Sequence, residues 1–356
     1  MLPLRAAVAV RPTHDLFSLV SPSILILRLS SLGDVVLTTP LVRALRARYP
    51  ESRIDLVLSA EYASLAPLLG GLTEVHLYDK RSGRQGLQAL RDKLRGLGYD
   101  VVLDLHNVPR TRLLRRRLAP NVRVVNKRTL LRWLLVHFKY DGLQAAPDVI
   151  GRYFETASSL GITDDGRAPV LTLPRPVETT PHRVAIAPGS RHGNKQWPTE
   201  HHVTLARTLL SRGYELVYYG STSETALVEE IRQQLPADAR HTSLAGALDL
   251  SETARSLAGC AVAVVNDSGL MHVARAVGTP VVALFGPTVR AFGFAPRVAA
   301  PEAARAVVLE VEGLSCRPCT AIGGPTCPKG HFRCMQAITP EQVLAAVTFD
   351  ERTATP

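Results

Sequence analysis

The sequence predicts an α/β protein of two domains, each a doubly wound parallel sheet. At 356 residues the chain exceeds the usual size of one domain. Apolar runs typical of buried parallel strands alternate with amphipathic helical patterns in both halves. Between the halves, Pro174, Pro176 and Pro181 interrupt the pattern and indicate a linker. We therefore expect domains at 23–176 and 182–347, after an N-terminal extension at 1–22, with a ligand cleft where the carboxyl ends of the two sheets face each other.

The individual elements follow from these periodicities. In the first half we expect strands at 24–27, 54–58, 74–77 and 101–105, and helices at 35–49, 60–69 and 87–97. In the second half we expect strands at 184–187, 216–219, 262–265 and 281–284, and helices at 201–212, 224–235, 251–258 and 272–277.

Composition and charge restrict the class of protein. Hydrophobic residues make up 46% of the chain and charged residues 21%, which excludes global disorder. No apolar run reaches the roughly 18–20 residues of a membrane span, and the apolar patch in residues 1–22 is shorter than a signal sequence requires. We therefore expect a cytoplasmic protein.

The net charge of +11 is concentrated in the first half. Residues 1–178 hold 26 Lys and Arg against 16 Asp and Glu, and residues 179–356 hold 16 against 15. A nucleic acid, a phosphorylated glycolipid or an anionic membrane would each suit such a basic half, as would a merely soluble surface. Cationic and apolar residues alternate from Arg110 to Lys139, a pattern that suits contact with a membrane surface.

Three segments after predicted strands carry candidate chemistry. In the first, Ser30 to Asp34, Gly33 permits a tight turn and Asp34 begins a helix, where its carboxylate is either a general base or a helix cap. The dinucleotide pattern G-x-G-x-x-G is absent from this turn, which argues against a nicotinamide dehydrogenase.

The second segment, Ala187 to Pro198, combines small residues with Ser190 and Lys195. It could accommodate a diphosphate whose developing charge the lysine offsets, although a plain glycine-rich turn has the same composition. The third, Val265 to His272, sets Asp267, Ser268 and Gly269 at the start of a helix, where phosphate or ribose groups bind.

Two further residues and a cysteine cluster complete the candidates. His272 either donates a hydrogen bond to a phosphate or is a packed histidine. Glu224 either accepts hydrogen bonds from ribose hydroxyls or is an ordinary acidic residue at a helix start. Cys316, Cys319, Cys327 and Cys334 could hold a structural zinc ion, remain free thiols or form disulfides.

These segments resemble glycosyltransferase family 9, the ADP-heptose:lipopolysaccharide heptosyltransferases. The matching stretches are Arg28 to Pro40, Ala187 to Pro198, Leu244 to Gly246, Asn266 to His272 and Leu284 to Thr288, and the likeness runs from about Ile24 to Val347, closer to the second-heptose branch. The chain departs from some members at Arg191, His192 and Gly193, which leaves phosphate contacts in that loop less secure than Lys195.

The resemblance implies a GT-B fold, two Rossmann-like domains facing a central cleft, and transfer with inversion. It implies that Asp34 is the catalytic base and that Lys195 steadies the departing ADP. The donor contacts that it implies are Gly33, Ser190, Glu224, Leu248, Asp267, Ser268, Gly269 and His272.

The predicted function is therefore transfer of heptose from ADP-heptose to a lipid A-Kdo-heptose acceptor in the inner core of lipopolysaccharide. We expect no cofactor for catalysis, no nucleic-acid partner, and peripheral contact of the basic half with the cytoplasmic face of the inner membrane. The alternatives are a family member using another nucleotide sugar, a nucleotide-sugar epimerase, and a non-catalytic nucleotide-sugar-binding protein.

Overall fold

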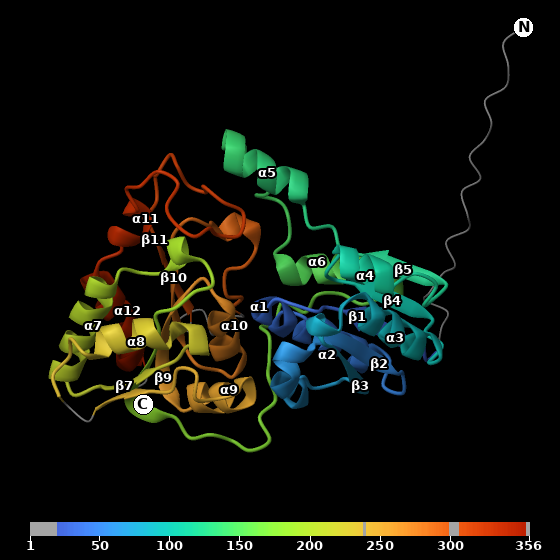
Figure 1. The fold of residues 1–356 in the computed structure, drawn as a ribbon, viewed down its shortest axis with the longest axis horizontal. Coiled ribbons are helices and arrows are strands. Elements are labelled where there is room, and N and C mark those ends of the chain that lie inside the picture. The colour runs from blue at the N-terminus through green and yellow to red at the C-terminus, as the bar shows by residue number, and fades with distance from the viewer. Residues whose placement is uncertain (1–19, 238–239, 299–305, 354–356) are drawn as a thin grey trace, which may run out of the picture.

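A computed structural model describes residues 20–237, 240–298 and 306–353. Most of the predicted 1–22 extension thus lies outside the described residues. Two α/β lobes lie side by side, the first half of the chain in one and the second half in the other (Figure 1). In the described part of the chain, no helix is both long and apolar enough to cross a membrane.

The first lobe contains a five-stranded parallel sheet in the order β3-β2-β1-β4-β5. Its elements are β1 (Ile24–Leu27), α1 (Leu32–Val36), α2 (Thr39–Arg48), β2 (Ile54–Ser59), the 3-10 helix η2 (Ala60–Leu68), β3 (Glu74–Tyr78), η3 (Lys80–Ser82), α3 (Gly83–Arg95), β4 (Val101–Asp104), α4 (Pro109–Leu114), β5 (Asn121–Val124), α5 (Thr129–Phe138), α6 (Val149–Thr156) and η4 (Ser158–Leu160).

The second lobe contains a six-stranded parallel sheet in the order β11-β10-β9-β6-β7-β8. Its elements are β6 (Thr180–Ala187), η5 (Gly193–Lys195), α7 (Thr199–Ser211), β7 (Glu215–Tyr218), η6 (Thr222–Glu224), α8 (Thr225–Arg232), β8 (His241–Ser243), α9 (Leu250–Ala258), β9 (Cys260–Asn266), α10 (Gly269–Ala276), β10 (Val281–Phe285), η7 (Arg290–Phe292), β11 (Ala306–Glu310), α11 (Arg333–Gln336) and α12 (Pro340–Thr353).

Both strand orders are those of doubly wound sheets, so the predicted fold class is confirmed. Alternate residues of β1 face opposite sides: Ile24 and Ile26 belong to one apolar core, and Leu25 and Leu27 to another. Burial on both faces explains why these strands read as continuous apolar runs. The strand order reverses beside β1 in one sheet and beside β6 and β9 in the other, and the loops after these strands carry the site.

Some boundaries differ from prediction. The single helix expected at 35–49 is two helices, because Pro40, in the first turn of α2, lacks the N–H that would continue α1. The helix expected at 60–69 is the 3-10 helix η2, which contains Pro67. Pro181, expected in the linker, lies in the irregular first part of β6, where the register shifts between Thr180 and Val184.

Candidate active site

Asp34 is the third residue of α1, in the turn that follows β1. Its Oδ2 accepts hydrogen bonds from the Ser31 hydroxyl at 2.6 Å and the Ser31 N–H at 3.2 Å. Its Oδ1 lies 2.6 Å from Arg28 Nη2 and 3.5 Å from the Tyr153 hydroxyl. The carboxylate thus caps the helix and also lines the cleft, so the capping role is confirmed and the role as a base stays a prediction.

The surroundings keep Asp34 ionised. Burial by itself would raise the pKa of this carboxyl, but the Arg28 charge and the hydrogen bonds from Ser31 outweigh it and lower the pKa below its usual value. Arg28 is itself fixed, since one of its guanidinium nitrogens donates to the Leu105 carbonyl. An ionised carboxylate is the form that can accept a proton from a hydroxyl group.

Lys195 lies in the loop after β6, in the second lobe, at the end of η5. Its ammonium nitrogen is 2.6 Å from Asp267 Oδ2, and only 10% of the side chain is exposed. The Thr288 hydroxyl donates to the same oxygen at 2.6 Å. Because Asp267 and Thr288 follow β9 and β10, three loops at one sheet edge hold the lysine in place.

Asp34 and Lys195 line the same cavity, of about 420 Å³, between the lobes. Among the other predicted residues, the cavity walls include Gly33, Ser190, Asp267, Ser268, Gly269 and His272. The acid and the lysine therefore face a common space although they come from opposite sheets.

Two glycines allow α1 and α10 to approach each other across the cleft. A Cβ atom on Gly33 would lie 2.5 Å from His272 Cδ2, and one on Gly269 would lie 2.9 Å from Leu32 Cβ. His272 is 5% exposed and packs against Gly33 while lining the cavity. Its pKa is lowered by burial, so the ring is neutral.

A second cavity of about 530 Å³ adjoins the first and shares Ser31, Ser190, Arg191, Ser268 and Gly269 with it. This volume lies within the roughly 300–1,000 Å³ of small-molecule sites. Its walls include Glu224 and the apolar side chains of Leu244, Leu248 and Leu250.

Glu224 is positioned beside the backbone of the second segment. Its Oε2 accepts from the N–H and hydroxyl of Ser221, at 2.7 Å and 2.8 Å. A Cβ on Gly189 would lie 2.1 Å from its Oε1, so glycine is needed there. The second cavity thus combines an acidic group with an apolar wall, as a nucleoside requires. All predicted donor residues line one or both cavities.

The third cavity was not predicted. It measures about 290 Å³, shares Ser31 and Asp34 with the first cavity, and is lined by Arg28, Lys127, Arg132 and Arg152. Lys127 and Arg132 belong to the basic stretch noted in the sequence, and Arg28 to the first segment. Arg152 could not be predicted from the sequence as a residue of this cavity. It lies in the amphipathic helix α6, and only the tertiary structure brings it to the cavity that Asp34 also lines.

The cysteine loop, residues 316–332, bridges the lobes. Lys139, next to α5, donates to the carbonyls of Cys316 and Pro318, and Arg132 donates to Ala321. On the other side, Asn194 and Gly324 exchange two hydrogen bonds beside Lys195. The loop therefore connects the lysine to the first lobe.

The described cysteines form no disulfide, and Cys334 lies in α11. Within the described ranges, no three of their sulfurs lie within 4.8 Å of one another, so the structure does not itself assemble a zinc site. Structural zinc stays a prediction.

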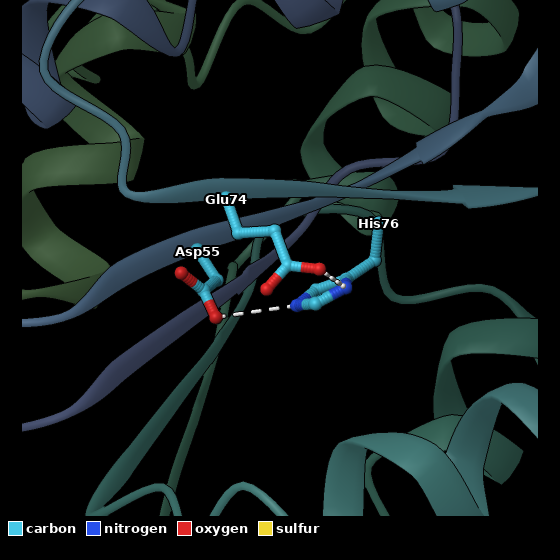
Figure 2. A group of neighbouring side chains, drawn as sticks. All are labelled: Asp55, Glu74 and His76. Carbon is cyan, nitrogen blue, oxygen red and sulfur yellow. Dashed lines mark hydrogen bonds and ion pairs between the residues drawn. The ribbon is translucent and has the colours of Figure 1, made fainter.

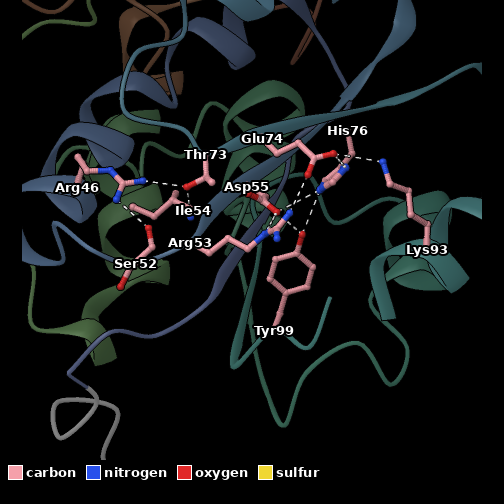
Figure 3. Close-up of polar contacts among 10 residues, drawn as sticks. All are labelled: Arg46, Ser52, Arg53, Ile54, Asp55, Thr73, Glu74, His76, Lys93 and Tyr99. Carbon is pink, nitrogen blue, oxygen red and sulfur yellow. Dashed lines mark hydrogen bonds and ion pairs between the residues drawn. The ribbon is translucent and has the colours of Figure 1, made fainter. Parts of the chain in front are cut away.

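A separate polar cluster joins Asp55, Glu74 and His76, on β2 and β3 (Figure 2). In the part of the chain that the structure describes, it is the one group of three possible metal-ligand atoms within 4.8 Å of one another. Asp55 Oδ2, however, already accepts from Arg53 at 2.6 Å and from the Tyr99 hydroxyl (Figure 3).

This cluster lies at the beginnings of β2, β3 and β4, the sheet edge away from the cleft. Glu74 is also paired with Arg53 and Lys93. Because cationic side chains already occupy the carboxylates, we assign the cluster a structural role.

The fold and the cleft define a GT-B glycosyltransferase: two doubly wound lobes, a nucleotide-sized cavity, and an acid and a lysine that line one cavity. The family model for "Glycosyltransferase family 9 (heptosyltransferase)" matches residues 87–325. The chain belongs to this family and is a glycosyltransferase.

Curated relatives include lipooligosaccharide heptosyltransferase 2 of Haemophilus influenzae, 29% identical over 90% of this chain and 97% of the relative. Lipopolysaccharide heptosyltransferase 2 of Escherichia coli K12 is 29% identical over 74% of this chain and 83% of its own.

Among solved structures, a family 9 glycosyltransferase from Veillonella parvula has a TM-score of 0.75 at 22% identity, covering 94% of this chain and 99% of its own. E. coli ADP-heptose lps heptosyltransferase II has a TM-score of 0.71 at 24% identity, covering 93% and 99%. These likenesses establish the fold.

Proposed function

We propose that the protein transfers heptose from ADP-heptose to the inner core of a lipopolysaccharide, with inversion at the anomeric carbon. One observation carries the proposal: Asp34 and Lys195, on opposite lobes, line a single cavity that continues into a nucleotide-sized one. The names of the curated relatives support heptose and lipopolysaccharide as substrates, and several of them are second heptosyltransferases.

The proposed reaction is one displacement. The acceptor hydroxyl oxygen bonds to the anomeric carbon of heptose, the bond from that carbon to the diphosphate oxygen breaks, and ADP leaves with the electron pair. Asp34 takes the hydroxyl proton as the new bond forms. Lys195 and the N–H groups that begin α10 lie where negative charge grows on the departing diphosphate.

The adenosine would occupy the second cavity, with Leu248 against the base and Glu224 accepting from ribose hydroxyls. The acidic and apolar walls of this cavity suit an adenosine better than a diphosphate, which supports this orientation of the donor. No residue in this scheme requires a metal ion or cofactor.

Turnover with defined acceptors tests the proposal. We expect ADP release from ADP-heptose when the acceptor is lipid A-Kdo bearing one heptose, and little release when that heptose is missing. Failure to release ADP with any acceptor would refute the function, and release only without the first heptose would reassign the position.

We also propose that the enzyme works at the cytoplasmic face of the inner membrane, with α5 against the lipid surface. Leu130, Trp133 and Phe138 of α5, and Tyr140 shortly after it, are 48–68% exposed, and Lys139 lies between Phe138 and Tyr140 in sequence. The helix stands out from both lobes (Figure 1). Apolar and cationic side chains together bind anionic interfaces. Co-sedimentation with vesicles containing anionic lipid should weaken in Trp133→Ser, and an unchanged result would argue against this contact.

The predicted structural zinc at Cys316, Cys319, Cys327 and Cys334 has its own test. We expect about one zinc per chain by elemental analysis, and its loss in Cys319→Ser, because four-coordinate thiolate sites need every ligand. Zinc-free protein with full activity and an unchanged melting temperature would refute this prediction.

A further inference from the structure

The boundary between the first and third cavities combines side chains from both lobes. Among the described residues, those that line both cavities are Ser31, Asp34, Phe294 and Ile322. The two polar residues belong to the first lobe and the two apolar residues to the second. Ile322 lies in the cysteine loop, and 61% of its side chain is exposed. A carboxylate from one lobe thus meets an apolar pair from the other at this boundary.

The backbone on either side of Ile322 is fixed by contacts with both lobes. The Ala321 carbonyl accepts from Arg132 Nη2, of the first lobe, at 2.5 Å. A Cβ atom on Gly323 would lie 2.5 Å from His192 Cγ, in the second-lobe loop after β6. The exposed isoleucine is therefore held at the boundary by its neighbours in the chain rather than by burial of its own side chain.

Asp34 as a general base does not by itself distinguish an acceptor hydroxyl from water. If water reacts, its oxygen bonds to the anomeric carbon, the bond to the diphosphate oxygen breaks and ADP leaves with the electron pair. Asp34 takes one proton, and the other stays on the sugar as part of its new hydroxyl. The products are ADP and free heptose, so this reaction destroys the donor. An apolar wall opposes it, because a water molecule finds no hydrogen-bond partner there.

We infer that Ile322 is a specificity-determining residue that covers the anomeric carbon beside Asp34 and keeps water away, so that heptose passes to the acceptor rather than to water. The inference rests on the proposed function and adds how the same site discriminates between two nucleophiles. Phe294, at the same boundary, extends the apolar wall. Exclusion of water from a reacting centre prevents hydrolysis of an activated group.

The balance of products in one reaction mixture tests this role. ADP released in excess of heptosylated acceptor measures hydrolysis, and heptosylated acceptor measures transfer, so their ratio does not depend on how much of the enzyme is folded. In Ile322→Ser, the shorter side chain opens the boundary and its hydroxyl supplies a partner for water. We expect the ratio of hydrolysis to transfer to rise about 2- to 13-fold, the factor that one hydrogen bond to water represents.

Ile322→Val and Leu77→Ser are the matched controls. Valine keeps the wall apolar, so the first variant should retain the wild-type ratio. Leu77 is 46% exposed on the outer strand β3 and lines none of the three cavities, so the same kind of change there should have no effect. The Kd for ADP should be unchanged in every variant, because Ile322 does not line the second cavity.

A wild-type ratio in Ile322→Ser, even at a reduced overall rate, would overturn the inference, because a merely structural role slows both reactions equally. So would an equal rise in Leu77→Ser. Absence of ADP release by the wild type with any acceptor would instead refute the proposed function, so the two failures are distinguishable.

Discussion

Gly33 in the first lobe and His272 in the second pack so closely that a Cβ on Gly33 would lie 2.5 Å from His272 Cδ2. His272 is buried and cannot swing into solvent. The contact lies one residue from Asp34, so the absence of a side chain at position 33 sets the separation between the base and the donor lobe.

Gly33→Ala should therefore damage catalysis more than folding. The added methyl group must displace His272 or separate α1 from α10, and overpacking of this kind costs about 1–3 kcal/mol. Because the strain is relieved by moving the base away from the donor lobe, we expect kcat/KM to fall about 5- to 160-fold, the factor that about 1–3 kcal/mol represents, with a small change in melting temperature. Gly96→Ala is the control, because a Cβ there would meet no atom closer than 3.4 Å. Equal activities of the two variants would contradict the account.

Arg28 should determine the acid limb of the pH profile. Burial raises the pKa of Asp34, and the Arg28 charge, with hydrogen bonds from Ser31, brings it below the usual value. As a base, Asp34 works above its pKa and stops as pH falls through it, so the wild-type acid limb should lie below about pH 4.

In Arg28→Gln, burial remains and the main opposing charge is gone, so the pKa should rise and the acid limb should move to higher pH. The profile of kcat/KM, extended to acid pH far enough to include the wild-type limb, measures this shift whatever happens to the absolute rate. Superimposable limbs would show that Arg28 does not control the carboxylate.

The Asp55 cluster should stabilise the first lobe without affecting chemistry. Hydrogen bonds from His76, Tyr99 and Arg53 outweigh burial and lower the pKa of Asp55. The stability that this ionised group contributes is present above its unfolded pKa of about 3.9 and is lost as pH falls through the lower folded value.

Asp55→Asn should lower the free energy of unfolding by about 1–3 kcal/mol at pH 7, because it leaves buried donors poorly paired. The gap between variant and wild type, measured by urea denaturation, should narrow at pH 3.5. Asp92→Asn, an exposed residue of α3, serves as control. If the difference in free energy of unfolding between wild type and variant instead grew at acid pH, the pKa of Asp55 could not be lowered in the folded protein.

The buried centre of each sheet was predictable and its periphery was not. β1 and β10 follow from continuous apolar runs, because both faces of these strands are covered. β5, β8 and β11 escaped prediction because each is an outer strand with partly exposed residues. The division of the segment into α1 and α2 was not predicted, because residues 35–49 have one continuous helical pattern.

The donor site was predictable because its residues follow strands directly. Asp34, Lys195 and Asp267 each lie within a few residues of the end of a strand, at a point where the sheet order reverses, so short sequence segments contain them. The third cavity instead combines Arg28, Lys127, Arg132 and Arg152, which are far apart in sequence and lie on four different parts of the first lobe. Only the folded chain brings them together and leaves buried nitrogens of Arg28, Arg132 and Arg152 without a hydrogen-bond partner.

Replacing the Asp34 carboxylate with an amide tests the central claim most directly. Asp34→Asn preserves the shape of the side chain and its bond from Ser31, but cannot take a proton. With ADP-heptose and a one-heptose acceptor, we expect kcat to fall about 10²- to 10⁴-fold while the Kd for ADP is unchanged. A variant that binds ADP normally and still transfers heptose at the wild-type rate would contradict the assignment of Asp34 as the base.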